Sequence, residues 1–159
     1  MVIAIAAGLA WTATATAQTE FKLKAHDAAA LDEFGISVSI SGDYAIVGAN
    51  RDDDGGFGSG SAYIFKWDGT SWSQQAKLTA LDAAAGDYFG ESVSISGDYA
   101  IVGALNNDDA GQASGSAYIF SRSGTTWNQQ TKLTASDAAI GDQFIRLEPS
   151  ICLANEACP

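Results

Sequence analysis

The chain has 159 residues, of which 47% are hydrophobic and 17% are charged, and this composition is typical of a folded protein rather than a disordered one. Its formal net charge is −11 at pH 7, so its surface repels phosphate backbones and nucleic acid is excluded as a partner. The many small residues, with Gly alone occurring 17 times, favour short strands and tight turns over long helices.

The first 17 residues combine an apolar run with the ending Ala15-Thr16-Ala17, which is typical of a signal peptide. No Lys or Arg precedes the run, and the run is shorter than the roughly 20 apolar residues of a membrane span. We therefore expect cleavage after Ala17 and a secreted or cell-surface protein without a membrane span. The alternative is that this segment forms a first strand or an apolar flap.

The stretch SVSISGDYAIVGA occurs at Ser37–Ala49 and again at Ser92–Ala104. Over the surrounding unit of 55 residues, 22–76 and 77–131 share 38 identical positions. A third copy begins at Lys132 and loses the pattern after Phe144. The chain is therefore predicted to contain tandem copies of one structural unit.

Each unit is predicted to form four strands. In the first copy, SVSIS alternates polar and apolar residues, YAIVGA is a nearly continuous apolar run, SAYIF follows a Gly-rich loop, and SWSQQAKLTA is more polar. These patterns indicate an inner strand, a strand buried on both faces, a third strand and an outer edge strand. The expected fold is all-β, with two four-stranded antiparallel β-propeller blades of 55 residues and a partial third.

The order Phe-Gly, Gly-Ala and GSAYIF recurs in both copies, at Phe34-Gly35 and Gly48-Ala49 and at Phe89-Gly90 and Gly103-Ala104. This order resembles the FG-GAP repeat, a family that builds the propeller of integrin alpha subunits and of bacterial surface proteins. The resemblance implies adhesion or protein recognition. It does not imply calcium, because the family's acidic loop would lie between these elements, where this chain has SVSISGDYAIV.

The segments are predicted as a signal peptide (1–17), the outer strand and linker of an incomplete blade (18–35), two blade repeats (36–90 and 91–144) and a divergent tail (145–159). Two blades do not close a ring, and they leave apolar faces uncovered. We expect either a fragment of a larger propeller, a homo-oligomer that completes the ring, or an open stack.

The acidic loop after the second strand is a candidate calcium site. Asn50, Asp52 and Asp54 alternate ahead of Gly55, as oxygen ligands do at the start of a calcium loop. The second copy replaces Asn50 with Leu105 and Gly55 with Ala110. A solvated acidic turn is the alternative interpretation.

Catalysis is not expected. The carboxylate pairs Asp27/Asp32 and Asp82/Asp87 recur in each copy, which favours turn roles over an acid and base in different environments. His26 has no counterpart in the other copies.

Binding is expected instead, because loops that vary on a constant frame carry specificity. The predicted function is a non-catalytic exported binding or adhesion module for a protein partner, with Arg51, Phe57 and Trp67 as ligand-binding candidates. A carbohydrate-binding propeller is one alternative, and a truncated fragment without independent function is another. Cys152 and Cys158 would close a small loop in an oxidising compartment.

Overall fold

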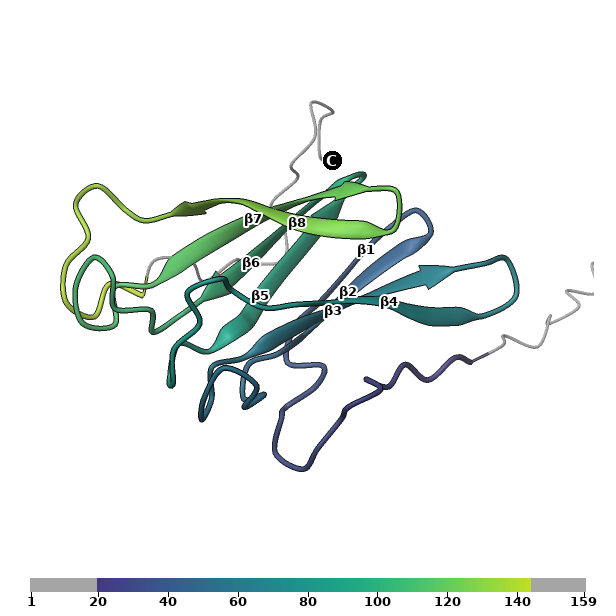
Figure 1. Cartoon of the computed structure of the whole chain (residues 1–159), viewed down its shortest axis with the longest axis horizontal. Coiled ribbons are helices and arrows are strands. Elements are labelled where there is room, and N and C mark those ends of the chain that lie inside the picture. Colours follow the sequence, from purple (N-terminus) through teal and green to yellow (C-terminus); the bar gives the residue numbers. More distant parts are fainter. Residues whose placement is uncertain (1–19, 144–159) are drawn as a thin grey trace, which may run out of the picture.

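The computed structural model in Figure 1 describes residues 20–143. The predicted signal peptide (1–17), the divergent tail (145–159) and the predicted disulfide of Cys152 and Cys158 lie outside the described residues.

The described residues form eight strands in two antiparallel sheets of four. We name the first sheet blade 1, and its strands follow one another in space as β1 (Val38–Ser41), β2 (Tyr44–Ala49), β3 (Ser61–Trp67) and β4 (Trp72–Leu78). Blade 2 has the same order, with β5 (Phe89–Ser96), β6 (Tyr99–Ala104), β7 (Ser116–Ser123) and β8 (Thr126–Leu133). The predicted all-β fold is confirmed, the ring is not closed, and no helix long and apolar enough to cross a membrane occurs in residues 20–143.

The local chemistry explains these elements. The turn between β1 and β2 has Gly42 at φ 56°, a left-handed conformation that glycine adopts without steric cost. After this turn, β2 is buried from Ala45 to its end, as its apolar sequence predicts. The outer strands β4 and β8 are more polar and more exposed. β5 begins at Phe89, within the segment assigned above to the first repeat.

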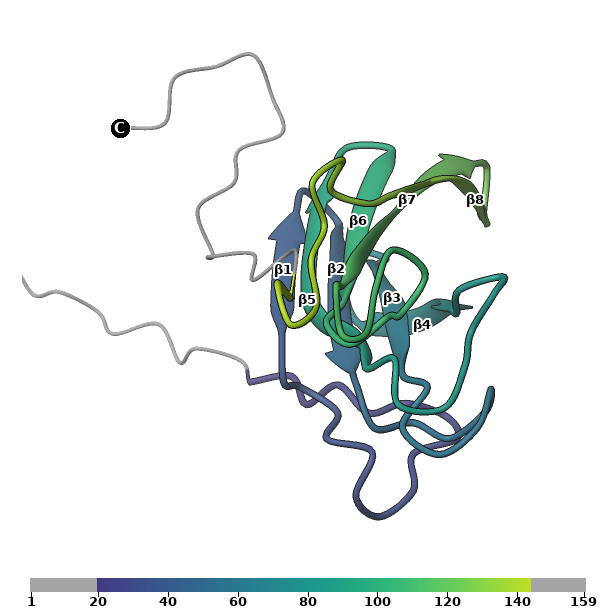
Figure 2. The ribbon, with the colours of Figure 1, turned by 90° about the vertical axis from the view of Figure 1, so that its left-hand side faces the viewer.

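The two blades pack face to face, and we call their interface the joint. β5 contacts β1, β2 and β3, whereas the outer strands β4 and β8 make fewer contacts; Figure 2 shows the sheets close at β1 and β5 and diverging toward β4 and β8. A Cβ atom on Gly48 would lie 2.0 Å from the carbonyl oxygen of Gly90. The backbones therefore approach more closely than any side chain permits.

Two apolar clusters hold this arrangement. The larger one fills the joint, where Ile46 and Ile64 of blade 1 meet Val93, Val102 and Phe120 of blade 2. The smaller one lies on the other face of blade 1, around Tyr63 and Phe65, and is partly covered by Leu23 and Phe34 from the segment that precedes β1.

Replacing Gly60 with Ala should destabilise the joint. Its Cβ would lie 2.0 Å from the carbonyl oxygen of Phe89, where the two residues form a parallel bridge. We expect the free energy of unfolding to fall by about 3 kcal/mol. The matched control is Gly69→Ala, which also has positive φ but no heavy atom within 4 Å of its Cβ among the described residues and should cost about 1 kcal/mol. Equal losses in urea unfolding would contradict the close approach.

Candidate functional site

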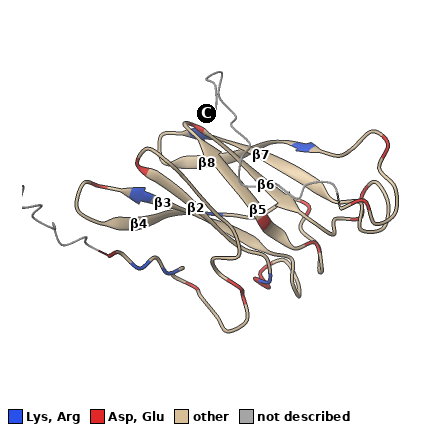
Figure 3. Ribbon diagram, turned by 180° about the vertical axis from the view of Figure 1, so that it is seen from behind, with Lys and Arg blue, Asp and Glu red and all other residues tan. Residues whose placement is uncertain are grey.

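The loop between β2 and β3, residues 50–60, is organised around the buried carboxylate of Asp52. This residue is 4% exposed and accepts hydrogen bonds from Ser61 Oγ at 3.0 Å and from Tyr63 Oη at 2.8 Å. The backbone N–H of Asp54 also donates to Asp52, at 3.2 Å. Most of the acidic residues lie in such loops and turns rather than in strands (Figure 3).

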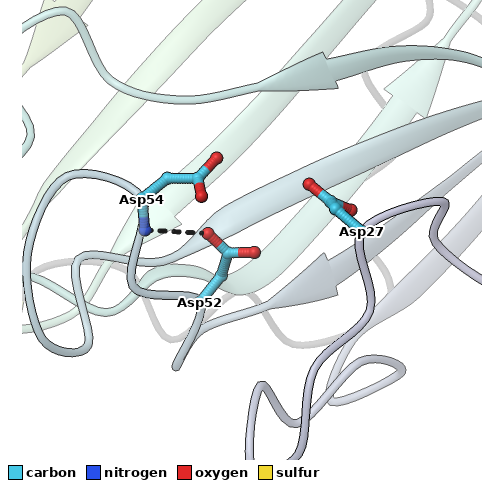
Figure 4. Close-up of side chains that lie close together, drawn as sticks. All are labelled: Asp27, Asp52 and Asp54. Carbon is cyan, nitrogen blue, oxygen red and sulfur yellow. Dashed lines mark hydrogen bonds between the residues drawn. The ribbon is translucent and has the colours of Figure 1, made fainter.

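Three carboxylates surround the ammonium group of Lys77, a residue of β4. Lys77 Nζ lies 2.7 Å from Asp27 Oδ2, 3.0 Å from Asp52 Oδ2 and 2.5 Å from Asp54 Oδ2. Figure 4 shows the three Asp side chains approaching from the linker before blade 1 and from the loop. We call these four residues the lysine cluster; it ties the linker, the loop and the outer strand together.

Within the lysine cluster, the ammonium group and the carboxylates stabilise each other's charged forms. The hydrogen bond from Lys77 lowers the pKa of Asp27 below its usual value. Burial opposes the ionisation of Asp52, but the hydrogen bonds from Lys77 and Tyr63 outweigh it, so the pKa of Asp52 is also lowered. Burial likewise opposes the charge on Lys77, yet its three carboxylate partners raise its pKa. Asp27, Asp52 and Lys77 are therefore charged at neutral pH.

The lysine cluster bears on the predicted calcium site. One carboxylate oxygen from each of Asp27, Asp52 and Asp54 lies within 4.8 Å of the others, but Lys77 already supplies their positive charge. The third predicted ligand, Asn50, donates from Nδ2 to Glu91 Oε2 across the joint at 2.5 Å. The structure thus brings together two of the three predicted ligands, and calcium at Asn50, Asp52 and Asp54 stays a prediction.

Blade 2 carries a reduced version of the lysine cluster. Lys132 Nζ contacts Asp82 at 2.7 Å and also Asp109. Asn107 takes the place of Asp52, and it bonds to Asp87 and Ser116. One carboxylate fewer surrounds this lysine.

A pocket of about 180 Å³ lies on the outer surface of the same loop. It is lined by Ala30, Leu31, Arg51, Asp53, Phe57, Gly58 and Tyr88. Arg51 is held by an ion pair with Glu33 at 3.2 Å. The linker between the blades is pinned to the loop because the N–H of Tyr88 donates to Gly58 at 3.0 Å. We call this the loop pocket.

The loop pocket joins two of the three predicted ligand-binding residues, Arg51 and Phe57. Phe57 is 80% exposed and its neighbour Leu31 is 84% exposed. Trp67 lies at the opposite end of β3, edge-on to Phe21 at 5.0 Å and near Trp72 at 5.6 Å between ring centroids. The structure therefore separates Trp67 from the other two candidates.

Leu31 was missed by the sequence reasoning, although the repeats contain the signal. Its φ is 78°, while the corresponding positions in the other copies are Gly86 and Gly141, also at positive φ. A leucine in this conformation is strained by about 1 kcal/mol or more. Strain of this kind concentrates at functional sites. Tyr88 also lines the loop pocket and has φ 55°, but its equivalents Glu33 and Gln143 share that conformation, so Leu31 differs in standing where the other copies have glycine.

Three residues that line the loop pocket of blade 1 are replaced in blade 2. In the second copy, Asn106 replaces Arg51, Gln112 replaces Phe57, and Gly86 replaces Leu31. The aspartates that recur serve the frame instead: Asp32, Asp87 and Asp142 each accept a hydrogen bond from the backbone N–H three residues earlier. The predicted turn roles of these carboxylates agree with these bonds.

Comparison with known proteins agrees with the repeat architecture. The model of the FG-GAP repeat matches residues 18–65 and 72–120, more than half of the chain. Each match begins ahead of the inner strand of a blade and ends in its third strand, so one sequence repeat spans the end of one blade and most of the next. No curated protein matches the chain.

Replacing Lys77 with Met should leave three carboxylates without a counter-charge. We expect the free energy of unfolding at pH 7 to fall by about 3 kcal/mol. The wild type should lose stability as the pH falls from about 5 through the lowered pKa values of Asp27 and Asp52. The deficit of the variant should shrink over the same range, because protonation relieves its carboxylates.

The control for Lys77→Met is Lys132→Met, which removes the counter-charge of two carboxylates rather than three. Urea unfolding at several pH values would measure both. A Lys77→Met deficit that is independent of pH would show that the lysine acts through packing alone.

Replacing Leu31 with Gly should stabilise the chain. The change relieves a positive φ at a side chain that is 84% exposed, so about 1 kcal/mol should be gained. The control Leu81→Gly alters an equally exposed leucine at 85% without a positive φ and should not stabilise. Thermal unfolding would compare them, and an unchanged or lower melting temperature for Leu31→Gly would refute strain at this site.

Proposed function

Because the chain belongs to the FG-GAP repeat family, we propose that it is a non-catalytic, exported binding module that recognises a protein partner at the loop pocket of blade 1. The observation that carries the proposal is the convergence of Arg51, Phe57 and strained Leu31 on one pocket. The proposal places the protein at the cell surface or outside the cell, in an adhesive role.

The size of the loop pocket favours a protein partner. Small-molecule sites commonly enclose about 300–1,000 Å³, whereas the loop pocket encloses about 180 Å³. Such a volume suits one side chain of a partner, flanked by the exposed rings and chains of Phe57 and Leu31. Arg51 adds a cation in a chain whose net charge is −11, so an acidic group beside an apolar side chain is the complementary feature.

The two repeats provide a natural comparison of frame and loop. The strand sequence YAIVGA is identical in β2 and β6, while five of the seven residues that line the loop pocket differ between copies. A change confined to these positions leaves the frame intact, because blade 2 folds with the alternative residues. This pattern is typical of loops selected for recognition.

The double substitution Arg51→Asn with Phe57→Gln gives two loop-pocket residues their blade 2 identities and tests the proposal. A displayed peptide library would be selected on the immobilised full-length chain. We expect enriched peptides with an acidic residue next to an apolar one, binding the double variant about tenfold or more weakly. Peptides that bind both proteins equally, or no enrichment, would overturn recognition at this pocket.

A glycan array with wild type and Trp67→Ala distinguishes the carbohydrate alternative. Glycan binding that Trp67→Ala abolishes would replace protein recognition as the function. Circular dichroism of each variant serves as the folding control.

A further inference from the structure

The face of blade 1 that points away from blade 2 exposes apolar residues of β1. Val38 and Ile40 are 68% and 66% exposed, whereas their counterparts Val93 and Ile95 in β5 are 8% and 4% exposed in the joint. We call the surface formed by Ile36, Val38 and Ile40 the front face. At these strand positions it has the apolar residues that blade 2 uses in the joint, but among the described residues no second sheet packs against it.

The opposite face of blade 2 is exposed in a complementary way. Ile46 and Ile64 of blade 1 are fully buried in the joint, but their counterparts Ile101 and Ile119 are partly exposed. Together with Tyr99, which is 58% exposed, they line a hollow of about 330 Å³. We call the surface formed by Tyr99, Ile101, Leu105 and Ile119 the back face.

We propose that the back face of one chain docks the front face of a second copy of the same chain, head to tail, and so reproduces the internal joint between molecules. The supporting observation is the residue-by-residue correspondence between these two surfaces and the two sides of the joint. The residues that make the joint recur, in the same strand positions, on the two exposed faces.

The polar contacts of the joint have counterparts on these faces. In the joint, the N–H groups of Ile95 and Gly97 donate to the hydroxyls of Ser39 and Ser41, both at 3.3 Å. The back face presents Ser94 and Ser96 at the same positions, and a second copy would bring the N–H groups of Ile40 and Gly42 to them.

One difference between the exposed faces and the joint occurs on both sides of the contact. Asn50 donates to Glu91 across the joint at 2.5 Å. The corresponding residues on the back and front faces are Leu105 and Ile36, so a polar pair is replaced by an apolar pair. Both members change together, as a second joint requires, because a lone carboxylate opposite Leu would be buried without a partner.

A second difference, on one side of the contact only, involves an aromatic ring. In the joint, the guanidinium of Arg122 lies 4.5 Å from the ring centroid of Tyr44, and Trp127 lies edge-on to the same ring. Between copies, Tyr99 would meet Trp67 and Trp72. The cation–π contact would become an aromatic one, which is also favourable.

The assembly requires one rearrangement. Residues 134–143 of the first copy and residues 24–33 of the second both correspond to the linker that joins the blades. Both would occupy the same place in the new joint, so one of the two segments has to move away. Ala25 and Asp32 are 2% and 8% exposed, whereas residues 134–143 are largely exposed. We therefore expect the C-terminal segment to be displaced. Head-to-tail contacts of this type add copies until a ring closes.

The first test is the solution mass of the full chain by light scattering, at several concentrations and with reductant, so that Cys152 and Cys158 cannot crosslink. We expect masses that are multiples of 16.4 kDa and that rise with concentration. A monomer at every concentration would overturn the proposal.

Two face variants test the geometry. Val38→Lys with Ile40→Lys blocks the front face, and Tyr99→Lys with Ile101→Lys blocks the back face. Each should be monomeric alone, and lysine lowers the net negative charge, so added repulsion between the acidic chains would not explain the loss. Mixed together, the two should form one heterodimer, because each retains the face that the other lacks. Variants that still associate alone, or a mixture without heterodimer, would refute head-to-tail docking.

The paired change allows a rescue experiment. Ile36→Glu should weaken association by about tenfold or more, and adding Leu105→Asn should restore it, because the new pair is the one found in the joint. Failure of the rescue in a folded double variant would overturn the match between the faces. Leu81→His, a change at a linker residue that is 85% exposed, is the control and should leave the mass unchanged.

Discussion

The close contact between neighbouring sheets is the constraint on which the rest of this structure depends. A four-stranded sheet with apolar residues on both faces is not stable alone in water, and here the two sheets cover each other through one face each. Gly48 and Gly90 allow backbone to meet backbone, and Ser39 and Ser41 satisfy N–H groups of the facing strand. The Phe-Gly and Gly-Ala elements of the repeat therefore serve to pack the two sheets together at the joint rather than to bind a ligand.

The joint also determines where variation is tolerated. Residues at the joint contact two sheets at once, so a change there must be matched on the facing sheet. The loop residues Arg51 and Phe57 contact solvent on one side and are free of that requirement. The lysine cluster, in turn, fixes the base of the loop by holding Asp52 and Asp54 against β4. A rigid base with a variable rim is suited to recognition.

The strands could be predicted from the sequence because their signals are local. The alternation in SVSIS, the apolar run YAIVGA and the turn glycines each act within a few residues. The lysine cluster could not be predicted in this way, because Asp27, Asp52 and Lys77 come from a linker, a loop and an outer strand. Their convergence depends on the path of the linker across the sheet, which no local pattern encodes. Asp52 and Asp54 were recognised as a pair, but the cation between them was not.

The strain at Leu31 could be predicted in part from the sequence, unlike the lysine cluster and less directly than the strands. Aligning the three copies places Leu31 opposite Gly86 and Gly141, and a leucine in a glycine position indicates either strain or a different backbone. In the structure Leu31 has the same backbone conformation as the two glycines, with φ 78° and similar values at both glycines, so the leucine is strained. The backbone of the turn is thus set by the repeat, and the side chain is an addition to it.

The paired changes at Asn50/Glu91 and Leu105/Ile36 also bear on the order of the blades. Repeats as similar as these are prone to wrong pairing, since either blade presents nearly the same surface. Docking Glu91 against Leu105 would bury a carboxylate without its partner, and docking Ile36 against Asn50 would leave an amide unpaired, and each mismatch costs free energy. The polar pair therefore directs blade 2 to a blade 1, which carries Asn50, and keeps it from the back face, which carries Leu105. Specificity between nearly identical surfaces rests on the few positions at which they differ.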